Sequence, residues 1–278
     1  MAVRNCKSGD TSRVLQSFIY TMNHCHYRTD LIRHHLKQSN KNRIYQWCGT
    51  WIVEADTTES LRLREIDPSI PMMKTIRPGD SFHTILSQKK NYFRNKCSAF
   101  TVCLVYDGNA VHYVFFLYDP KKHALTSFDP GVGLYLHGQN TIVPRVQKAF
   151  QHAGLCRFSY KNNHLGACHV YRFKKKRHGV QYNGNELSSF PADAFCQSWT
   201  LFVFIRFLYQ SKDTIRSFLL KWCEIPPPQR QVFLLQSFIV PVMTFKPKVL
   251  EDVSRHSGFP LNQNLDLLFQ QIEECIFR

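Results

Sequence analysis

The chain has 278 residues, of which 44% are hydrophobic, and its 36 basic residues exceed its 20 acidic residues by a formal net charge of +16. This composition is that of a globular protein with a sizeable core, and the charge favours partners such as nucleic acid, an acidic surface or an acidic protein. No apolar run reaches the roughly 20 residues of a membrane span, and no long apolar segment follows the basic start, so we expect neither membrane anchoring nor secretion. An intracellular protein, in the cytoplasm or nucleus, should keep its ten cysteines mostly reduced.

The first third of the chain is polar and basic, with scattered aromatic residues. We expect one or two helices within residues 12–36 and a strand over residues 44–54. Residues 68–78 contain three prolines, which predict a loop.

The middle of the chain contains three apolar runs rich in β-branched and aromatic residues, at 100–106, 111–118 and 124–128. Turn signals separate these runs, and Asp129-Pro130-Gly131 ends the third. Strands joined by such tight turns form an antiparallel meander. Beyond the meander we expect a helix over residues 144–153 and further strands over 155–160 and 168–173.

The last part of the chain is mainly helical by its apolar periodicity. The expected helices cover residues 196–210, which are apolar on most sides, and residues 211–222, 229–239 and 264–277. Together with the strands, they predict an α+β fold with a central, mostly antiparallel sheet packed by helices.

Three residues from this arrangement form a candidate catalytic triad. His112 lies at the start of one strand and Asp129 at the end of the next, so antiparallel pairing brings both to the same edge of the sheet. A carboxylate there would orient the imidazole and stabilise imidazolium, as in a nucleophilic triad. Cys196 begins the buried helix, where the helix dipole, free backbone N–H groups and a neighbouring imidazolium would favour a reactive thiolate.

The order and placement of these residues resemble the adenain-like and SUMO-protease-like cysteine peptidase superfamily. Residues 108–129 are similar to its segment running from histidine to the acid, and residues 193–204 are similar to the segment that carries the cysteine and opens the central helix. Cys196-Gln197 replaces the usual Cys-Gly, and Cys-Gln-Ser-Trp resembles the predicted thiol proteases of large DNA viruses. The resemblance implies an adenain-like fold with a basic, packed extension over residues 1–94, a peptidase core over 95–225 and a helical extension over 226–278.

The superfamily usually places an oxyanion-binding glutamine five to seven residues before the cysteine. Ser189, Phe190 and Pro191 occupy those positions here. Gln197, the more distant Gln181 or the backbone alone would then have to hold the oxyanion, and losing one such donor typically costs about 10²–10³ in rate.

The resemblance implies a thiol protease that needs no cofactor and acts on a protein substrate. Its triad would be Cys196, His112 and Asp129, and it would process either viral structural proteins, during virion maturation in the host cytoplasm or virion, or ubiquitin-like-modified proteins. Two other classes stay open. Relatives of the fold include acyltransferases with the same three residue types, and a basic scaffold or nucleic-acid-binding protein could retain the fold without activity.

A basic cluster at residues 172–177 is the strongest candidate anion site. Its cationic members, which would contact phosphate groups electrostatically, are Arg172, Lys174, Lys175, Lys176 and Arg177.

Histidines and cysteines gather at His24-Cys25-His26, at His34-His35 and at Cys48. Their spacing matches no zinc-binding pattern, so we expect no metal site.

Overall fold

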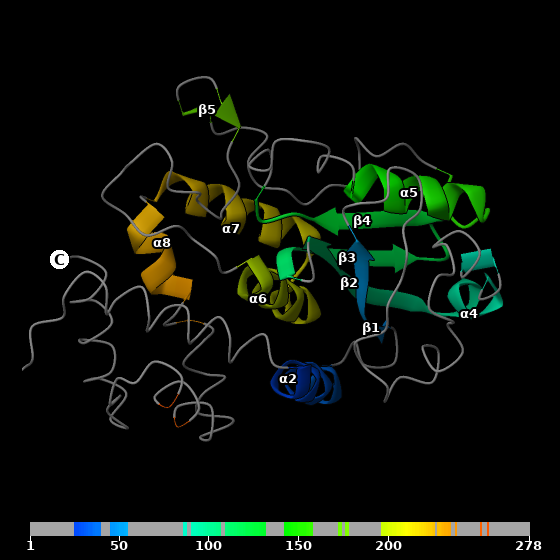
Figure 1. The fold of residues 1–278 in the computed structure, drawn as a ribbon, viewed down its shortest axis with the longest axis horizontal. Coiled ribbons are helices and arrows are strands. Elements are labelled where there is room, and N and C mark those ends of the chain that lie inside the picture. The colour runs from blue at the N-terminus through cyan, green and yellow to red at the C-terminus, as the bar shows by residue number, and fades with distance from the viewer. Residues whose placement is uncertain are drawn as a thin grey trace, which may run out of the picture.

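A computed structural model of the chain describes residues 25–39, 45–54, 86–87, 90–106, 109–131, 142–157, 172–173, 176–177, 196–225 and 227–234, with isolated positions at 237, 251 and 255. A run of three consecutive strands and a run of three consecutive helices occur among these residues, as in an α+β protein (Figure 1). The sequence-based predictions for residues 68–78 and 264–277 lie outside the described residues.

One sheet of four strands forms the centre of the described part, in the order β1-β2-β3-β4. The strands are β1 (Tyr45–Glu54), β2 (Cys97–Tyr106), β3 (Asn109–Asp119) and β4 (Ala124–Phe128). The pairs β2–β3 and β3–β4 are antiparallel, which confirms the meander.

The first strand makes the sheet mixed, because β1 pairs with β2 in parallel. The prediction of a mostly antiparallel sheet was therefore wrong for this strand. Tight turns fix the direction of β2, β3 and β4 locally, whereas a long connection joins β1 to β2, and a crossover of that length permits parallel pairing.

The helices over residues 142–152, 196–209 and 212–224 lie within a few residues of their predicted positions, whereas the helix over residues 90–95 was not predicted. Six helices have the bounds α2 (Cys25–Gln38), α4 (Lys90–Asn95), α5 (Ile142–His152), α6 (Cys196–Tyr209), α7 (Lys212–Glu224) and α8 (Pro227–Leu234). The strand expected over residues 155–160 is absent at 155–157, the part of it that the structure describes. Of the strand expected over 168–173, the structure describes only its end, as part of a short hairpin.

Helices cover both faces of the sheet (Figure 1). On one face, Phe100 and Phe116 stack on each other, and Phe100 also stacks on Phe150 of α5. Phe93 of α4 contacts the same Phe150 ring, so α4 and α5 share one core with this face.

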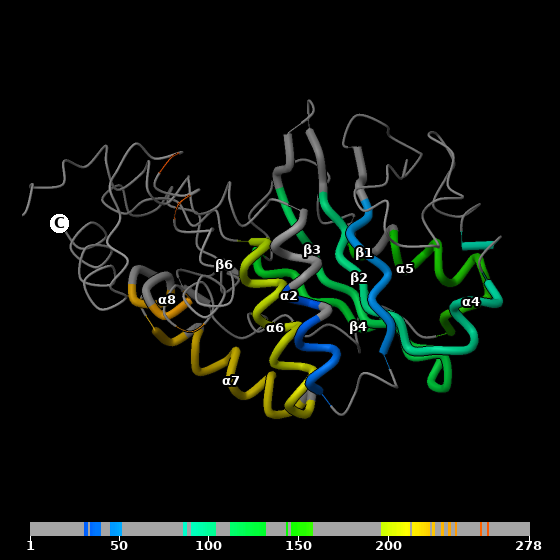
Figure 2. Tube along the Cα trace, turned by 90° about the horizontal axis from the view of Figure 1, so that it is seen from below, coloured from blue at the N-terminus to red at the C-terminus, as the bar shows by residue number. Residues whose placement is uncertain are grey.

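On the other face, α6 lies across β3 and α2 lies beside it (Figure 2). Phe204 of α6 contacts Phe115 of β3 and Trp47 of β1. A hydrogen bond of 3.1 Å between His35 Nδ1 and the Tyr209 hydroxyl joins the ends of α2 and α6.

The far side of α6 is covered as well, so this helix is the central element of the helical layer. Its Phe202 contacts Phe218 of α7 and Phe233 of α8. The Arg206 guanidinium lies over both the Phe202 and Phe218 rings, 4.9 and 4.2 Å from their centroids. Packing on all sides fixes the position of α6, and Cys196, the candidate nucleophile, is its first residue.

Candidate functional site

The candidate site lies where β3 begins, β4 ends and α6 starts. His112 is the fourth residue of β3, and Asp129 follows the last residue of β4. Cys196 is the first residue of α6, which packs on β3. The structure thus brings all three predicted triad residues to this region, from the elements that the sequence predicted.

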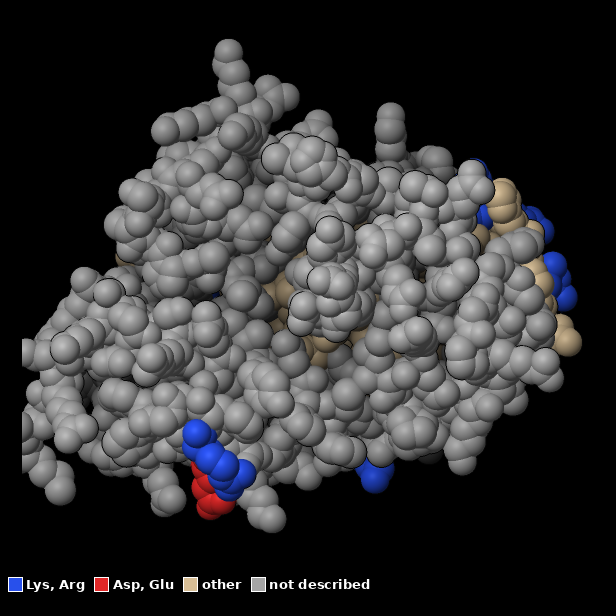
Figure 3. All heavy atoms as spheres, viewed as in Figure 1, with Lys and Arg blue, Asp and Glu red and all other residues tan. Residues whose placement is uncertain are grey.

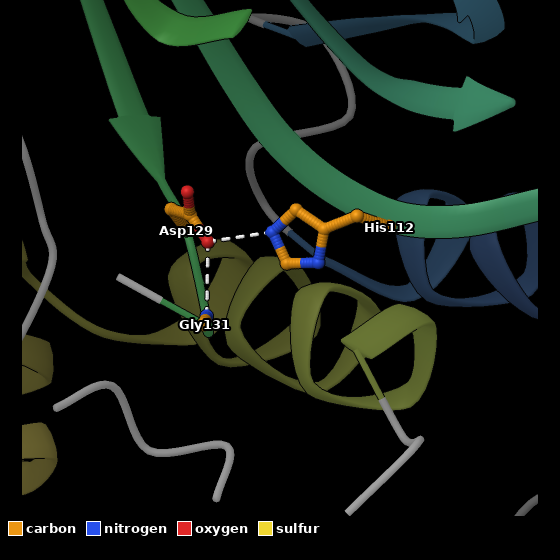
Figure 4. Close-up of polar contacts among 3 residues, drawn as sticks. All are labelled: His112, Asp129 and Gly131. Atoms are coloured by element: carbon orange, nitrogen blue, oxygen red, sulfur yellow. Dashed lines mark hydrogen bonds and ion pairs between the residues drawn. The ribbon is translucent and has the colours of Figure 1, made fainter. Parts of the chain in front are cut away.

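His112 and Asp129 form the most direct contact of the site (Figure 4). The His112 Nε2 atom lies 2.7 Å from the Asp129 Oδ1 atom, and the two side chains are 4% and 19% exposed. A charge-assisted hydrogen bond of this length fixes the orientation of the imidazole ring. Nε2 faces the carboxylate, and Nδ1 is buried within the protein.

The turn after β4 holds the carboxylate in place. The Gly131 backbone N–H donates a hydrogen bond of 2.9 Å to the same Asp129 Oδ1 atom that accepts from His112 (Figure 4). This is the local geometry for which an aspartate two residues before a glycine is favoured in turns. The Asp129-Pro130-Gly131 stop signal therefore ends the strand and also orients the acid.

Cys196 is a buried thiol against the sheet. It is 7% exposed and packs in one apolar cluster with Cys103 of β2 and Tyr113 of β3. Its side chain lies near enough to His112 to contribute to the raised pKa of that imidazole. The imidazole is therefore in contact with the Asp129 carboxylate through Nε2 and lies in the neighbourhood of the Cys196 thiol.

The pKa of His112 reflects these neighbours. Burial disfavours the imidazolium and lowers the pKa, but the Asp129 charge and hydrogen bond raise it, and the interactions with Cys196 raise it further. The net effect raises the pKa of His112 from 6.5 to about 10. The imidazole is therefore protonated at neutral pH and can donate a proton there.

Sequence reasoning missed a backbone irregularity next to His112. Leu104 pairs with His112, but Val105 pairs with Ala110, so β3 has one extra residue, Val111, at this point. A β-bulge of this kind bends the strand and re-aims the neighbouring side chain, and such bulges are common beside active sites. No residue in Asn109-Ala-Val-His112 signals it.

Gln197, the predicted oxyanion donor, follows Cys196 in the first turn of α6. Its side chain is 3% exposed, and both amide atoms, Oε1 and Nε2, are buried. Neither amide atom has a hydrogen-bond partner among the residues that the structure describes. A buried amide without hydrogen-bond partners costs about 1–3 kcal/mol of folding free energy.

The basic cluster expected at residues 172–177 lies on a short hairpin. Arg172 pairs with Arg177, and Phe173 pairs with Lys176, in the antiparallel strands β5 (Arg172–Phe173) and β6 (Lys176–Arg177). Lys174, Lys175 and the side chains of the two strands lie outside the described part of the structure.

Over the described ranges, no group of three or more His, Cys, Asp or Glu side chains is placed to hold a metal ion. His24 lies outside these ranges, and His35 instead bonds with Tyr209. No helix in the part of the chain that the structure describes is long and apolar enough to cross a membrane.

In comparisons with known proteins, no protein-family model and no curated protein sequence matches this chain. Residue chemistry and geometry therefore carry the functional argument.

Proposed function

We propose that the protein is a cysteine endopeptidase of the adenain-like and SUMO-protease-like type, with the fold of that superfamily. The observation that carries the proposal is the buried 2.7 Å contact between His112 and Asp129, combined with the interaction of the same imidazole with Cys196. An acid, a base and a thiol connected in this order have the roles of a nucleophilic triad.

In the proposed reaction, the Cys196 thiolate attacks the scissile carbonyl carbon and forms a C–S bond. The His112 imidazolium gives its proton to the leaving amine as the C–N bond breaks, which leaves a thioester on Cys196. Neutral His112 then takes a proton from water as the water oxygen attacks the thioester, and the C–S bond breaks, which releases the acid and restores the thiolate–imidazolium pair. Asp129 keeps the ring oriented and stabilises its charged form throughout.

The oxyanion of each tetrahedral intermediate would be held at the first turn of α6. Backbone N–H groups at a helix start have no intrahelical partner, so the Cys196 N–H is available to a developing negative charge. The buried amide of Gln197 is the second donor in this proposal, in place of the glutamine that the superfamily carries before its cysteine.

The proposed substrates are proteins, either viral structural precursors or proteins joined to ubiquitin-like modifiers. The same triad chemistry would also support acyl transfer from a thioester donor, and a basic binding protein could retain the fold without any turnover. Peptide cleavage would distinguish a peptidase from an acyltransferase, because an acyltransferase would consume an acyl-coenzyme A instead.

The first test follows alkylation of Cys196 by iodoacetamide as a function of pH, with peptide mapping against the other nine cysteines. Selective labelling at mildly acidic pH that is lost in His112→Ala is the expected result, because the imidazolium stabilises the thiolate. Labelling of Cys196 only after unfolding would instead make it a core residue, and the proposal would fail. Cys156, buried in the opposite core, provides an internal control.

A further inference from the structure

A second surface, far from the triad, gathers cationic side chains from three separate segments. Its members come from α4 with the residue that follows it, from the β3–β4 turn, and from the second half of α5 with the residues that follow it. We call this surface the terminal basic patch, and it consists of Lys90, Arg94, Lys96, Lys121, Lys122, Lys148 and Arg157.

Contacts among these segments place them at one end of the sheet. The Arg157 backbone N–H donates to the His123 carbonyl at 3.2 Å, which joins the residues after α5 to the β3–β4 turn. The Lys90 Nζ atom lies beside Gly154, since a β-carbon added to Gly154 would be 3.0 Å from it. This contact places α4 next to the residues after α5. Ser98 pairs with Tyr118, so the start of β2 lies beside the end of β3.

The side chains of the terminal basic patch are exposed, except that of Lys90, which is half-buried. Within the described part of the chain, the one side-chain ion pair is that of His112 with Asp129, outside the patch. Asp119 is the one described acid next to them, and its Oδ1 accepts hydrogen bonds from the Lys121 and Lys122 backbone N–H groups. Figure 3 shows basic side chains along this margin, over α4 and the end of α5, with no acidic side chain coloured beside them.

We infer that the terminal basic patch binds the phosphate backbone of nucleic acid without reading sequence. Seven cations over three segments present a broad positive surface, and repeating phosphate charges are the partner that matches it best. Binding of nucleic acid would be a property in addition to the proposed peptidase activity. The terminal basic patch is also a different surface from the hairpin of residues 172–177, which the sequence alone favoured as the anion site.

The position of the patch leaves the candidate site open. His112 and Asp119 are seven residues apart on β3, which corresponds to about 23 Å along a strand. A nucleic acid bound beyond the β3–β4 turn would hold the protein at the end of the sheet opposite the triad. Bound nucleic acid and a polypeptide at Cys196 can therefore be accommodated together.

The test measures binding of a fluorescent DNA duplex of random sequence by anisotropy, over salt concentrations from about 50 to 200 mM. The full-length triple variant K121Q, K122Q and R157Q is compared with a control triple variant, K37Q, R216Q and K221Q. The control removes the same number of exposed charges from α2 and α7. Both sets of side chains are exposed, and equal urea midpoints for all proteins would establish that folding is unchanged.

We expect the patch variant to bind at least about tenfold more weakly than the control and to lose about 2–3 units of the slope of log K against log salt. Equal losses in the two variants would overturn the inference, because binding would then follow net charge alone. A third triple variant, K174Q, K175Q and K176Q, tests the hairpin, and a loss of DNA binding in that variant alone would overturn the inference in favour of the hairpin. Tighter binding of poly-glutamate than of DNA would overturn the assignment to nucleic acid. None of the substituted residues belongs to the triad, so the labelling of Cys196 should be the same in every variant. The test of nucleic-acid binding can therefore fail without affecting the test of the proposed peptidase.

Discussion

At the scale of single residues, the charge of Asp129 is what keeps His112 protonated despite complete burial. Asp129→Asn retains the shape of the side chain but removes that charge, so burial would then dominate and the pKa of His112 would fall. We expect peptide cleavage to drop by about 10²–10⁴, the usual contribution of acid–base catalysis. The alkylation rate of Cys196 at mildly acidic pH should drop as well, since less imidazolium is present to stabilise the thiolate.

A control variant separates the effect of Asp129→Asn on the reactivity of Cys196 from any effect on folding. Asp119→Asn changes an aspartate at the opposite end of β3, in a turn that also uses its carboxylate as an acceptor. That variant should label like the wild type. If Asp129→Asn labelled with an unchanged pH profile, the acid would have no role in maintaining the imidazolium.

His112 also predicts how stability depends on pH. Its folded pKa of about 10 lies above the ordinary value of 6.5, so the native state binds the proton more tightly than the unfolded state does. The stabilisation is complete below about pH 6.5 and is lost as the pH rises through about 10. Urea denaturation between these values should show a decrease on the order of a few kcal/mol that His112→Gln largely lacks. If the free energy of unfolding changed with pH in the same way for the wild type and for His112→Gln, the raised pKa of His112 would be contradicted.

At the scale of elements, the first turn of α6 makes a prediction that separates binding of the oxyanion from activation of the thiol. Gln197→Ala removes a buried amide without described partners, so the free energy of unfolding should stay within about 1 kcal/mol or rise. Cleavage should decrease by about 10²–10³, because one oxyanion donor is lost. Alkylation of Cys196 forms no oxyanion and should keep its rate. If Gln197→Ala cleaved peptide as fast as the wild type, the backbone N–H of Cys196 would be sufficient to bind the oxyanion, and Gln197 would have no role in it.

The sequence could predict most elements because their signals are local. Apolar runs rich in β-branched and aromatic residues, separated by turn signals, located β2, β3 and β4, and the Pro-Gly pair after Asp129 located the end of the last strand. The parallel pairing of β1 was not predictable, because register across a long connection depends on which core the strand completes. Trp51 lies beside Phe100 and Phe93 in that core, and nothing near Trp51 in the sequence specifies these neighbours.

The candidate site shows the same division between local and tertiary information. The places of His112, Asp129 and Cys196 at a strand start, a strand end and a helix start were predictable from the sequence. The bulge at Val111 and the buried amide of Gln197 were not, because both depend on how the chain meets its tertiary neighbours. The surface that the charges form was also hidden, since members of the terminal basic patch are far apart in sequence.

At the scale of the whole molecule, the sheet extends across the predicted boundary between the N-terminal extension and the peptidase core. β1 precedes residue 94 and β2 follows it, yet the two pair along most of their length. Trp47 and Tyr45 of β1 contact Phe204 and Phe207 of α6, the helix that begins with Cys196. The N-terminal segment thus packs against the same helix that begins with Cys196, the candidate nucleophile.

We therefore expect a fragment of residues 95–225 to lack a cooperative fold, whereas residues 25–234 should retain one. Without β1, the fragment exposes the edge of β2 and the aromatic face that Trp51 covers, and burial of a tryptophan of this kind is worth on the order of 4–6 kcal/mol. Most domains have only about 5–15 kcal/mol of total stability, so this loss alone removes much of it. Urea denaturation followed by tryptophan fluorescence should show a sigmoidal transition for residues 25–234 and a gradual change for residues 95–225. A cooperative transition in the shorter fragment, with Cys196 still labelled at mildly acidic pH, would establish that the core folds and forms its site without β1.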